Sequence, residues 1–220
     1  LRPKQAKLRA AKGQTIVQES GYAEHSMLLL NGWAALSKTM PEGEVQIIDV
    51  MLPGDFALVG AEVAPVAAFT VEALTDISYL AVPLEHVNGP GPEHAELRRL
   101  FTALLVTTQA RMSELLLRMG RSSGACRVAY TLLELYVRLE QIGLTRNGRF
   151  RLPMNQHKIG EFTGLSNVHV CRTMRRFARN GLITNFDNQE ISLNNLNALS
   201  DFAGVDLTRL RKEIFLRRPQ

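Results

Sequence analysis

Short apolar runs separated by turn residues fill the first part of the chain. Between Gln14 and Pro83 the runs are four to seven residues long, with Gly, Pro, Asn and Asp between them. Runs of this length with such breaks predict antiparallel strands. The predicted strands cover residues 15–18, 26–30, 33–38, 45–51, 69–74 and 77–82. Many short strands in succession indicate a small antiparallel roll or barrel.

Three turn signals lie within this region. Asn31-Gly32 predicts a two-residue hairpin, because both central positions of a mirror-image turn require a positive φ. Pro41-Glu42-Gly43 and Pro53-Gly54-Asp55 predict two further turns. Ahead of the strands, residues 1–12 hold five basic residues and no acidic one. We interpret this segment as a solvated helix in preference to a nucleic-acid-binding arm.

The spacing of apolar residues becomes helical near Glu93. From 93 to 120 they recur at intervals of four and three, which predicts a heptad seam between two long helices. The predicted dimerisation residues are Phe101, Leu105, Thr108, Met112, Leu115 and Met119. A neighbouring stripe of Leu97, Leu100 and Leu104 is expected to pack on the roll. An apolar stripe also suits an intramolecular core, but a helix of ~40 Å with two stripes favours a dimer.

The rest of the chain predicts a second, mainly helical domain. Residues 125–142 keep a helical spacing, while residues 182–184 and 190–193 flank Asp187-Asn188 as a small hairpin, or wing. Residues 194–203 predict a closing helix, followed by a basic tail. We therefore expect an α+β fold. Its parts are an antiparallel β-roll sensory domain (1–92), a dimerisation helix (93–120), a hinge (121–124) and a winged helix-turn-helix domain with the tail (125–220).

Residues 155–181 predict two short helices joined by a tight turn. Asn155 and Ser166 are good N-caps, and Gly164 and Gly181 provide the backbone freedom that a turn and a helix end require. Gly160 allows the two helices to approach each other closely. The second helix, 166–180, has an apolar face for packing. That face consists of Val170, Met174 and Phe177.

The other face of the second helix is polar and rich in guanidinium groups. It carries Asn167, His169, Cys171, Arg172, Arg175, Arg176 and Arg179. A helix with one packed side and one basic side is suited to a DNA major groove. The distribution of charge agrees, since residues 1–120 have 10 basic and 13 acidic side chains while residues 121–220 have 16 and 8. A polyanion is therefore expected to bind the second half.

Composition excludes several other classes of protein. No apolar run approaches ~20 residues, so no membrane partner is expected. Cys126 and Cys171 form neither a disulfide framework nor a metal-ligand motif, which suits a reducing cytoplasm and predicts no metal site. The first residue is Leu rather than Met, so an N-terminal segment, including a targeting segment, can precede the chain.

The order of these motifs resembles the Crp/Fnr family of bacterial transcription regulators over roughly residues 12–204. LLLNGWA at 28–34 and PGDF at 53–56 are similar to its β-roll, and FRLPM at 150–154 with the glycines at 160 and 164 is similar to its winged helix-turn-helix. The segment VHVCRT at 168–173 is similar to recognition helices of an alphaproteobacterial branch. The resemblance implies a homodimer that binds an inverted-repeat operator on double-stranded DNA and recruits or blocks RNA polymerase.

Three departures from the family concern its effectors. Members that bind cyclic nucleotides hold the phosphate with an Arg-Ser/Thr pair, whereas residues 57–68 contain no arginine or lysine, with Ala67 and Ala68 at the expected places. Cyclic AMP is therefore not expected as a cofactor, because its buried phosphate would lack charge-assisted hydrogen bonds. No cysteine cluster precedes Cys126, as iron–sulfur members require. His25, His86 and His94 are conceivable haem ligands but are more simply surface or core residues. The effector stays unknown.

The resemblance also suggests roles within the DNA-binding surface. Arg172 is expected to read guanine, and Asn167 either adenine or a phosphate. Arg175, Arg176 and Arg179 are expected to lie along phosphates, or simply on a solvated face. Gln156, His157 and Ser166 lie at the helix N-termini, where a phosphate is favoured. Val168 stands where many relatives have a base-reading glutamate, so the preferred half-site is expected to differ from theirs.

Cys171 has two interpretations, and the chain as a whole has two alternative functions. The thiol of Cys171 lies beside Arg172 and one turn before Arg175, which favours an oxidisable thiolate and a possible redox switch; it also suits a small residue that merely fits the groove. Catalysis is not expected, because Cys171 and His169 are two residues apart and point to different sides of a helix. A ligand- or redox-sensing module that acts through a protein partner, with weak DNA binding, is the alternative.

Overall fold

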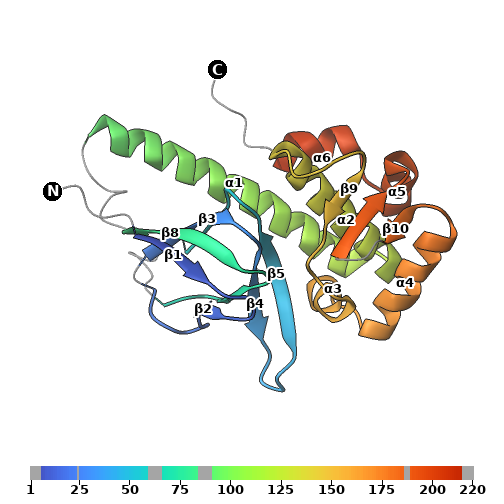
Figure 1. Ribbon diagram of the computed structural model, residues 1–220, viewed down its shortest axis with the longest axis horizontal. Coiled ribbons are helices and arrows are strands. Elements are labelled where there is room, and N and C mark those ends of the chain that lie inside the picture. The colour runs from blue at the N-terminus through green and yellow to red at the C-terminus, as the bar shows by residue number, and fades with distance from the viewer. Residues whose placement is uncertain (1–5, 24, 59–65, 84–90, 186–188, 215–220) are drawn as a thin grey trace. The chain divides into compact units, whose positions relative to one another are not determined.

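The computed structural model describes residues 6–23, 25–58, 66–83, 91–185 and 189–214. The chain divides into two compact units, residues 1–109 and 110–220, and the long helix α1 contributes to both. Figure 1 shows the elements of each unit. Among the described residues, every helix is too short or too polar to cross a membrane.

The first unit contains two four-stranded antiparallel sheets. Its strands are β1 Ala6–Ala10, β2 Thr15–Val17, β3 His25–Asn31, β4 Ala34–Thr39, β5 Val45–Met51, β6 Phe56–Ala57, β7 Thr70–Ala73 and β8 Ile77–Pro83. The sheet orders are β1-β8-β3-β6 and β2-β7-β4-β5. Alternate residues point inward to a shared core that includes Met27, Leu29, Met51, Val71 and Ile77. The predicted antiparallel roll is confirmed.

The structure corrects the prediction of a helix near the N-terminus. In place of a solvated helix, Ala6–Ala10 forms an edge strand that pairs antiparallel with β8. The basic side chains of Lys7 and Arg9 stay exposed, while Ala10 is buried. The charge pattern therefore described the solvated side of a strand, and the partner strand lies about seventy residues away in sequence, where local periodicity gives no signal.

The prediction of a hairpin at Asn31-Gly32 is wrong. The strands on either side, β3 and β4, belong to different sheets, so the pair forms a corner between sheets. Gly32 takes a φ of 86°, and its amide donates to the Asn31 side chain at 2.9 Å. A Cβ on Gly32 would lie 2.4 Å from the carbonyl oxygen of Asp76, so this corner excludes a side chain. The turns at Gly43 and Gly54, both with positive φ, are confirmed.

Helix α1, Pro92–Arg121, contains the predicted long helix but corrects part of its seam. Phe101 is buried and its ring meets that of Phe56 edge-on at 5.0 Å, so it belongs to the core of the first unit. Leu104 is buried as expected, whereas Leu100 is 42% exposed, and the side chain of Leu97 lies outside the described residues. The remaining seam residues are exposed or partly exposed. They are Leu105, Thr108, Met112, Leu115 and Met119.

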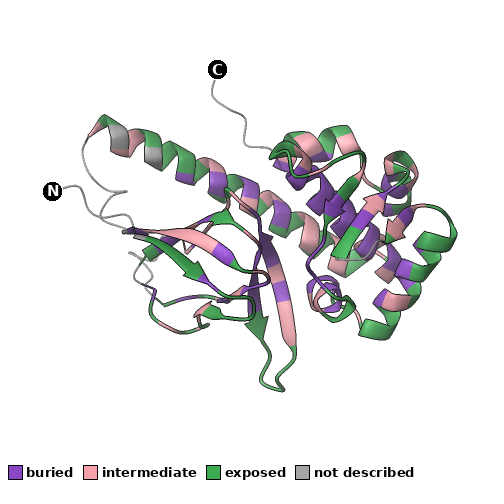
Figure 2. Ribbon diagram, in the orientation of Figure 1, coloured by how far each residue is buried: buried purple, intermediate pink, exposed green. Residues whose placement is uncertain are grey.

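The second unit contains the remaining helices around a small sheet. They are α2 Gly124–Gln141, α3 Gln156–Thr163, α4 Asn167–Arg179, α5 Leu196–Ala203 and α6 Leu207–Ile214. The sheet order is β10-β11-β9, with β9 Arg149–Arg151, β10 Ile183–Asn185 and β11 Glu190–Leu193. Figure 2 shows α2 as mostly buried, and α4 with a buried side and an exposed side.

Four features of this unit bear on the predictions. The wing hairpin is present as the antiparallel pair β10–β11, although the tip at 186–188 lies outside the described residues. A third strand, β9, was not predicted. The basic tail contains helix α6, which buries Leu210 and Ile214 and pairs Arg211 with Glu140 at 2.9 Å. Between α1 and α2 the helices break at residues 122–123, with Ser123 as N-cap of α2.

Candidate DNA-recognition surface

The turn between α3 and α4 is built from the residues that the sequence indicated. Asn155 caps α3 by accepting from the amide of Lys158 at 2.9 Å, and Ser166 caps α4 by accepting from the amide of His169. Gly164 ends α3 in the left-handed region with a φ of 63°. A Cβ on Gly160 would lie 2.4 Å from the carbonyl oxygen of Leu165, so only glycine allows this approach. These local features fix the angle at which α4 leaves α3.

The inner face of α4 anchors it to the unit. Val170, Met174 and Phe177 are buried, as predicted, and Thr173 joins them. Because residues at spacings of three and four share one side of a helix, this buried stripe determines which residues point outward. The orientation of α4 is thus a consequence of its apolar pattern.

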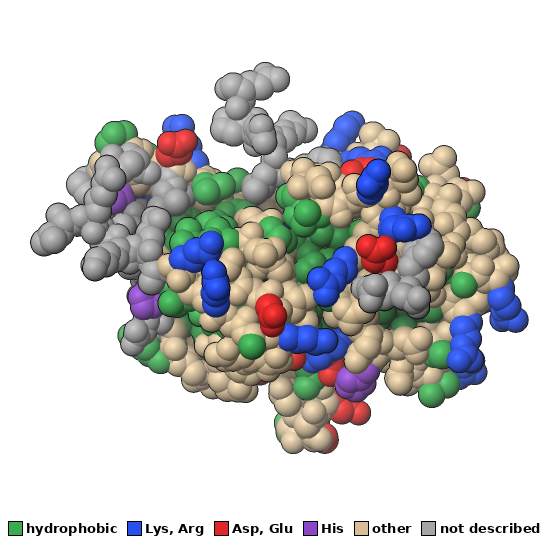
Figure 3. Space-filling view, viewed as in Figure 1, with side chains coloured by type: hydrophobic (Ala, Val, Ile, Leu, Met, Phe, Trp, Pro, Cys, Tyr) green, Lys and Arg blue, Asp and Glu red, His purple; other side chains and the backbone are tan. Residues whose placement is uncertain are grey.

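The outward stripe of α4 consists of four exposed residues at spacings of four, three and four. They are Val168, Arg172, Arg175 and Arg179. Three guanidinium groups in a row create a positive ridge on a rod about 10–12 Å across, which fits a DNA major groove. Figure 3 shows Lys and Arg side chains along the edge of this unit where α4 lies. Val168, which is 61% exposed, is the one apolar member of the stripe.

His169 and Arg176 flank the stripe on one side and lie against their own unit. The His169 Nε2 atom is only 2.6 Å from where a Cβ on Gly124 would be, so its ring covers the start of α2. The Arg176 guanidinium lies 5.5 Å from the ring centroid of Phe202. Both residues nevertheless line an open cleft of about 860 Å³ with Arg172, Arg175 and Arg179. Four arginines therefore line this cleft, which gives it a positive potential that favours anions.

Asn167 lies on the other flank, in a second groove that it shares with Gln156 and His157. The structure therefore brings together three of the predicted contact residues from two helices. His157 also lies 3.2 Å from Glu161, which Lys158 contacts at 3.1 Å. Cys171 is half-buried on the same helix.

Arginine contacts inside the unit were not predicted from sequence. Arg127 of α2 donates to the carbonyl oxygen of Thr163 at 2.9 Å and so holds the C-terminal end of α3. Its partner is a backbone oxygen 36 residues away, which leaves no signal in side-chain composition. Arg127 therefore stabilises the two-helix unit that presents the candidate surface.

The expected effector region of the roll is described only in part, because residues 59–65 and His86 lie outside the described residues. A cation from outside residues 57–68 reaches this region, because Lys38 donates to the carbonyl oxygen of Ala68 at 2.8 Å. Lys38 is also 2.6 Å from Glu19, and its hydrogen bond lowers the pKa of that carboxyl. Among the described residues there is no group of three metal-ligating side chains.

A β-roll, a long helix and a winged helix-turn-helix with a guanidinium-lined outer stripe define a DNA-binding transcription regulator. A cyclic nucleotide-binding domain matches residues 7–89, and a Crp-like helix-turn-helix domain matches residues 126–202. The chain belongs to the Crp/Fnr family of transcription regulators.

Individual proteins agree with this assignment. The chain is 26% identical over 201 residues to the transcriptional activator protein FnrL of Cereibacter sphaeroides, covering 88% of this chain and 79% of FnrL. It is 25% identical over 172 residues to the transcriptional activator protein FnrA of Stutzerimonas stutzeri, covering 78% and 70%. The structure of FixK2 from Bradyrhizobium japonicum superimposes with a TM-score of 0.80 and 25% identity, over 90% of this chain and 96% of FixK2.

Proposed function

We propose that this regulator binds DNA as a homodimer whose two α1 helices pair along the exposed part of the seam. The supporting observation is that Leu105 and Met112 are 52% and 44% exposed on a helix of 30 residues. Two-fold symmetry then presents two α4 helices to one face of DNA, about 34–36 Å apart, on a pseudo-palindromic operator. The relatives that it matches are transcription regulators, so we expect no catalytic role, and we expect the chain in the cytoplasm, where chromosomal DNA and RNA polymerase are.

The outward stripe of α4 carries the recognition chemistry in this proposal. Arg172, near the N-terminal end of the stripe, reads a guanine through its two-pronged guanidinium. Arg175 and Arg179 lie along phosphates with Arg176, and Asn167, Gln156, His157 and Ser166 contact the operator from the start of α4 and α3. RNA polymerase is the proposed protein partner, which the activator names of FnrL and FnrA support.

Titration of the protein with operator DNA at several salt concentrations tests this function. Each phosphate contact contributes a slope of ~0.9 in log K against log salt, so a dimer with three such arginines per subunit gives a slope of at least about 5. A slope near zero, or equal affinity for operator and unrelated DNA, contradicts sequence-specific regulation. Either result would favour the sensing module that acts through a protein partner.

The signal that controls DNA binding is proposed to be something other than cyclic AMP. Lys38, which contacts the expected phosphate region at Ala68, is already paired with Glu19. A second possible signal is oxidation of Cys171, in which peroxide converts the thiol to a sulfenic acid and is reduced to water. Peroxide should then abolish operator binding by the native chain but not by Cys171→Ser; unchanged binding by the native chain refutes the switch.

A further inference from the structure

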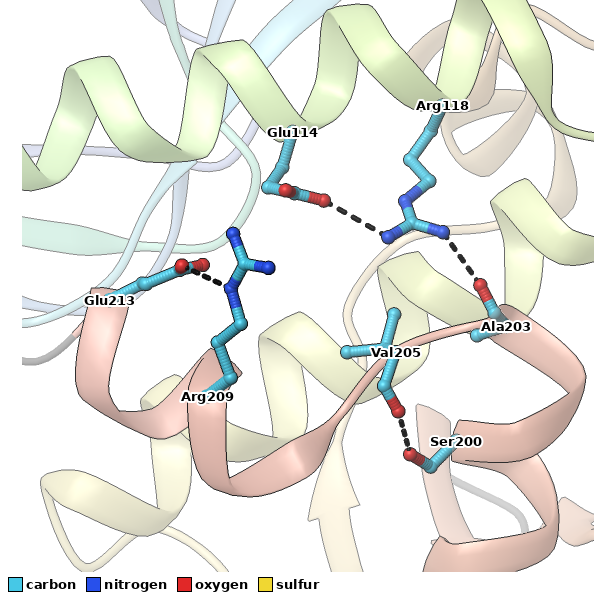
Figure 4. A network of polar contacts seen from close by, with 7 residues as sticks. All are labelled: Glu114, Arg118, Ser200, Ala203, Val205, Arg209 and Glu213. Carbon is cyan, nitrogen blue, oxygen red and sulfur yellow. Dashed lines mark hydrogen bonds and ion pairs between the residues drawn. The ribbon is translucent and has the colours of Figure 1, made fainter.

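Within the second unit, an arginine near the end of α1 contacts the end of α5. The Nη1 atom of Arg118 donates to the carbonyl oxygen of Ala203 at 2.7 Å, and Nη2 donates to Glu114 at 3.0 Å. The guanidinium also lies 4.9 Å from the ring centroid of Tyr130, and the side chain is only 13% exposed. Figure 4 shows the guanidinium spanning the space between Glu114 on α1 and the end of α5.

The end of α5 is suited to receive this cation. The last carbonyl groups of a helix lack partners within the helix and carry the negative end of its dipole. Gly204 ends α5 in the left-handed conformation, and Ser200 donates to the carbonyl oxygen of Val205, which holds the following turn in place. Arg118 therefore binds a fixed acceptor, 85 residues away in sequence, through a charge-assisted bond.

The residue before Ala203 links α5 to the recognition helix. The Phe202 ring meets the Phe177 ring edge-on at 5.3 Å, and the Arg176 guanidinium lies 5.5 Å from the Phe202 ring centroid. Phe177 belongs to the buried face that orients α4. Two adjacent residues of α5 thus contact α1 on one side and α4 on the other.

We propose that Arg118 is a positioning residue, which sets the direction of α4 relative to α1 through the end of α5. This proposal rests on the proposed dimerisation through α1. If the two α1 helices form the dimer axis, the direction of α4 relative to α1 determines the distance between the two recognition helices. Arg118 then determines which spacing between operator half-sites the dimer accepts.

Operators whose half-sites are separated by one base pair more or fewer test the proposal. The native chain should prefer one spacing, and Arg118→Ala should lose about tenfold in affinity at that spacing, the loss expected for a charge-assisted hydrogen bond. The affinity of this variant for operators with altered spacings should fall less than its affinity at the preferred spacing. The preference for one spacing should therefore become weaker. Affinity for a single half-site should stay within about twofold, because the α4 surface is unchanged. Arg118→Lys, which keeps the charge but not the fork, should restore part of the preference.

Arg209→Ala is the matched control. Arg209 also pairs with a carboxylate one helical turn away, Glu213 at 2.6 Å, but its side chain is 74% exposed. This variant should keep the native preference for spacing. If Arg118→Ala is folded and keeps the native preference, the proposal is wrong.

Phe202→Leu decides the matter should Arg118→Ala not fold. It keeps an apolar side chain but loses the ring contacts to α4, so it should also weaken the spacing preference; an unchanged preference overturns the proposal. A native chain that is monomeric, or that binds all spacings equally, overturns it together with dimerisation through α1. A native dimer with a strict preference that Arg118→Ala retains refutes only the positioning role.

Discussion

The role of each arginine on α4 follows from the direction in which its side chain points. Arg172 and Arg175 both lie on the outward stripe, but Arg172 is nearer the helix N-terminus, the end that contacts bases in helix-turn-helix proteins. Arg172→Ala should cost ~1–3 kcal/mol on the preferred operator and relax selection at one base pair. Arg175→Ala should weaken all sequences equally and reduce the salt slope by about 1 per subunit. Fluorescence anisotropy on single-base variants distinguishes the two; equal weakening by Arg172→Ala contradicts base reading.

Val168 should read a methyl group. It is the apolar member of the outward stripe, one turn before Arg172, and the C5-methyl of thymine is the apolar feature of the major groove. Replacing that thymine by uracil in one half-site should lower affinity about fourfold, the contribution of one buried methyl group. Val168→Ala should remove this sensitivity, whereas Arg175→Ala should retain it. The reading is refuted if no thymine in the half-site shows the effect.

The buried hydroxyl group of Tyr130 lowers the stability of the second unit, because it has no hydrogen-bond partner among the described residues. Burial, with a further contribution from Glu134, raises the pKa of this hydroxyl. The folded state therefore favours the neutral phenol, and this stability is present below pH ~10 and lost as the pH rises further. Tyr130→Phe should keep or raise stability at neutral pH by up to ~1 kcal/mol and reduce the loss above pH 10. Urea unfolding at pH 7 and pH 10.5 measures both; a destabilised variant at pH 7 contradicts the unpaired hydroxyl.

Among the helices, α6 is one that the sequence analysis did not predict. The helix has apolar residues at spacings of three and four, which are Leu207, Leu210 and Ile214. The basic residues around them led to the prediction of a basic tail in place of a helix. Leu210 is 2% exposed, so Leu210→Ala should cost ~2–5 kcal/mol in the free energy of unfolding. Chemical denaturation measures this loss, and Arg209→Ala, on the exposed side, serves as the control. A loss below ~0.5 kcal/mol would mean that α6 does not pack as described.

An acidic residue introduced into the predicted seam of α1 tests whether this helix forms the dimer interface. Met112→Asp should yield a monomer with nearly native stability, because an exposed position tolerates a carboxylate in the monomer but not between two helices. Met40→Asp makes the same change at another exposed methionine, in the β4–β5 turn, and should leave the oligomeric state unchanged. Sedimentation velocity distinguishes the two species. A Met112→Asp dimer would place the interface elsewhere.

Sequence predicted what depends on neighbours in the chain. The strand Val45–Met51 and the caps Asn155 and Ser166 appear where expected, because alternation and capping are local. Edge strand β1 and the Asn31-Gly32 corner were mispredicted, because each depends on strands that are distant in sequence. The buried position of Phe101 depends on Phe56, and the contact of Arg118 depends on a backbone oxygen. Neither partner leaves a pattern that spacing alone can reveal.

One long helix, α1, follows the β-roll in the chain and precedes the basic winged helix-turn-helix. Positive charge is concentrated in residues 121–220, so we expect the second half to supply affinity for DNA and the outward stripe of α4 to supply sequence choice. Pairing of α1 would convert two weak half-site contacts into one tight operator contact. The family membership of the chain agrees with this division of labour.

Selection of bound duplexes from a random pool distinguishes operator recognition by a symmetric dimer from other ways of binding DNA. The account predicts enrichment of an inverted repeat whose half-sites are centred 10–10.5 base pairs apart, about one turn of DNA. Each half-site should contain the guanine that is lost as a preference in Arg172→Ala. A pool that stays random, or that converges on one unpaired motif with no dependence on Arg172, would contradict the account.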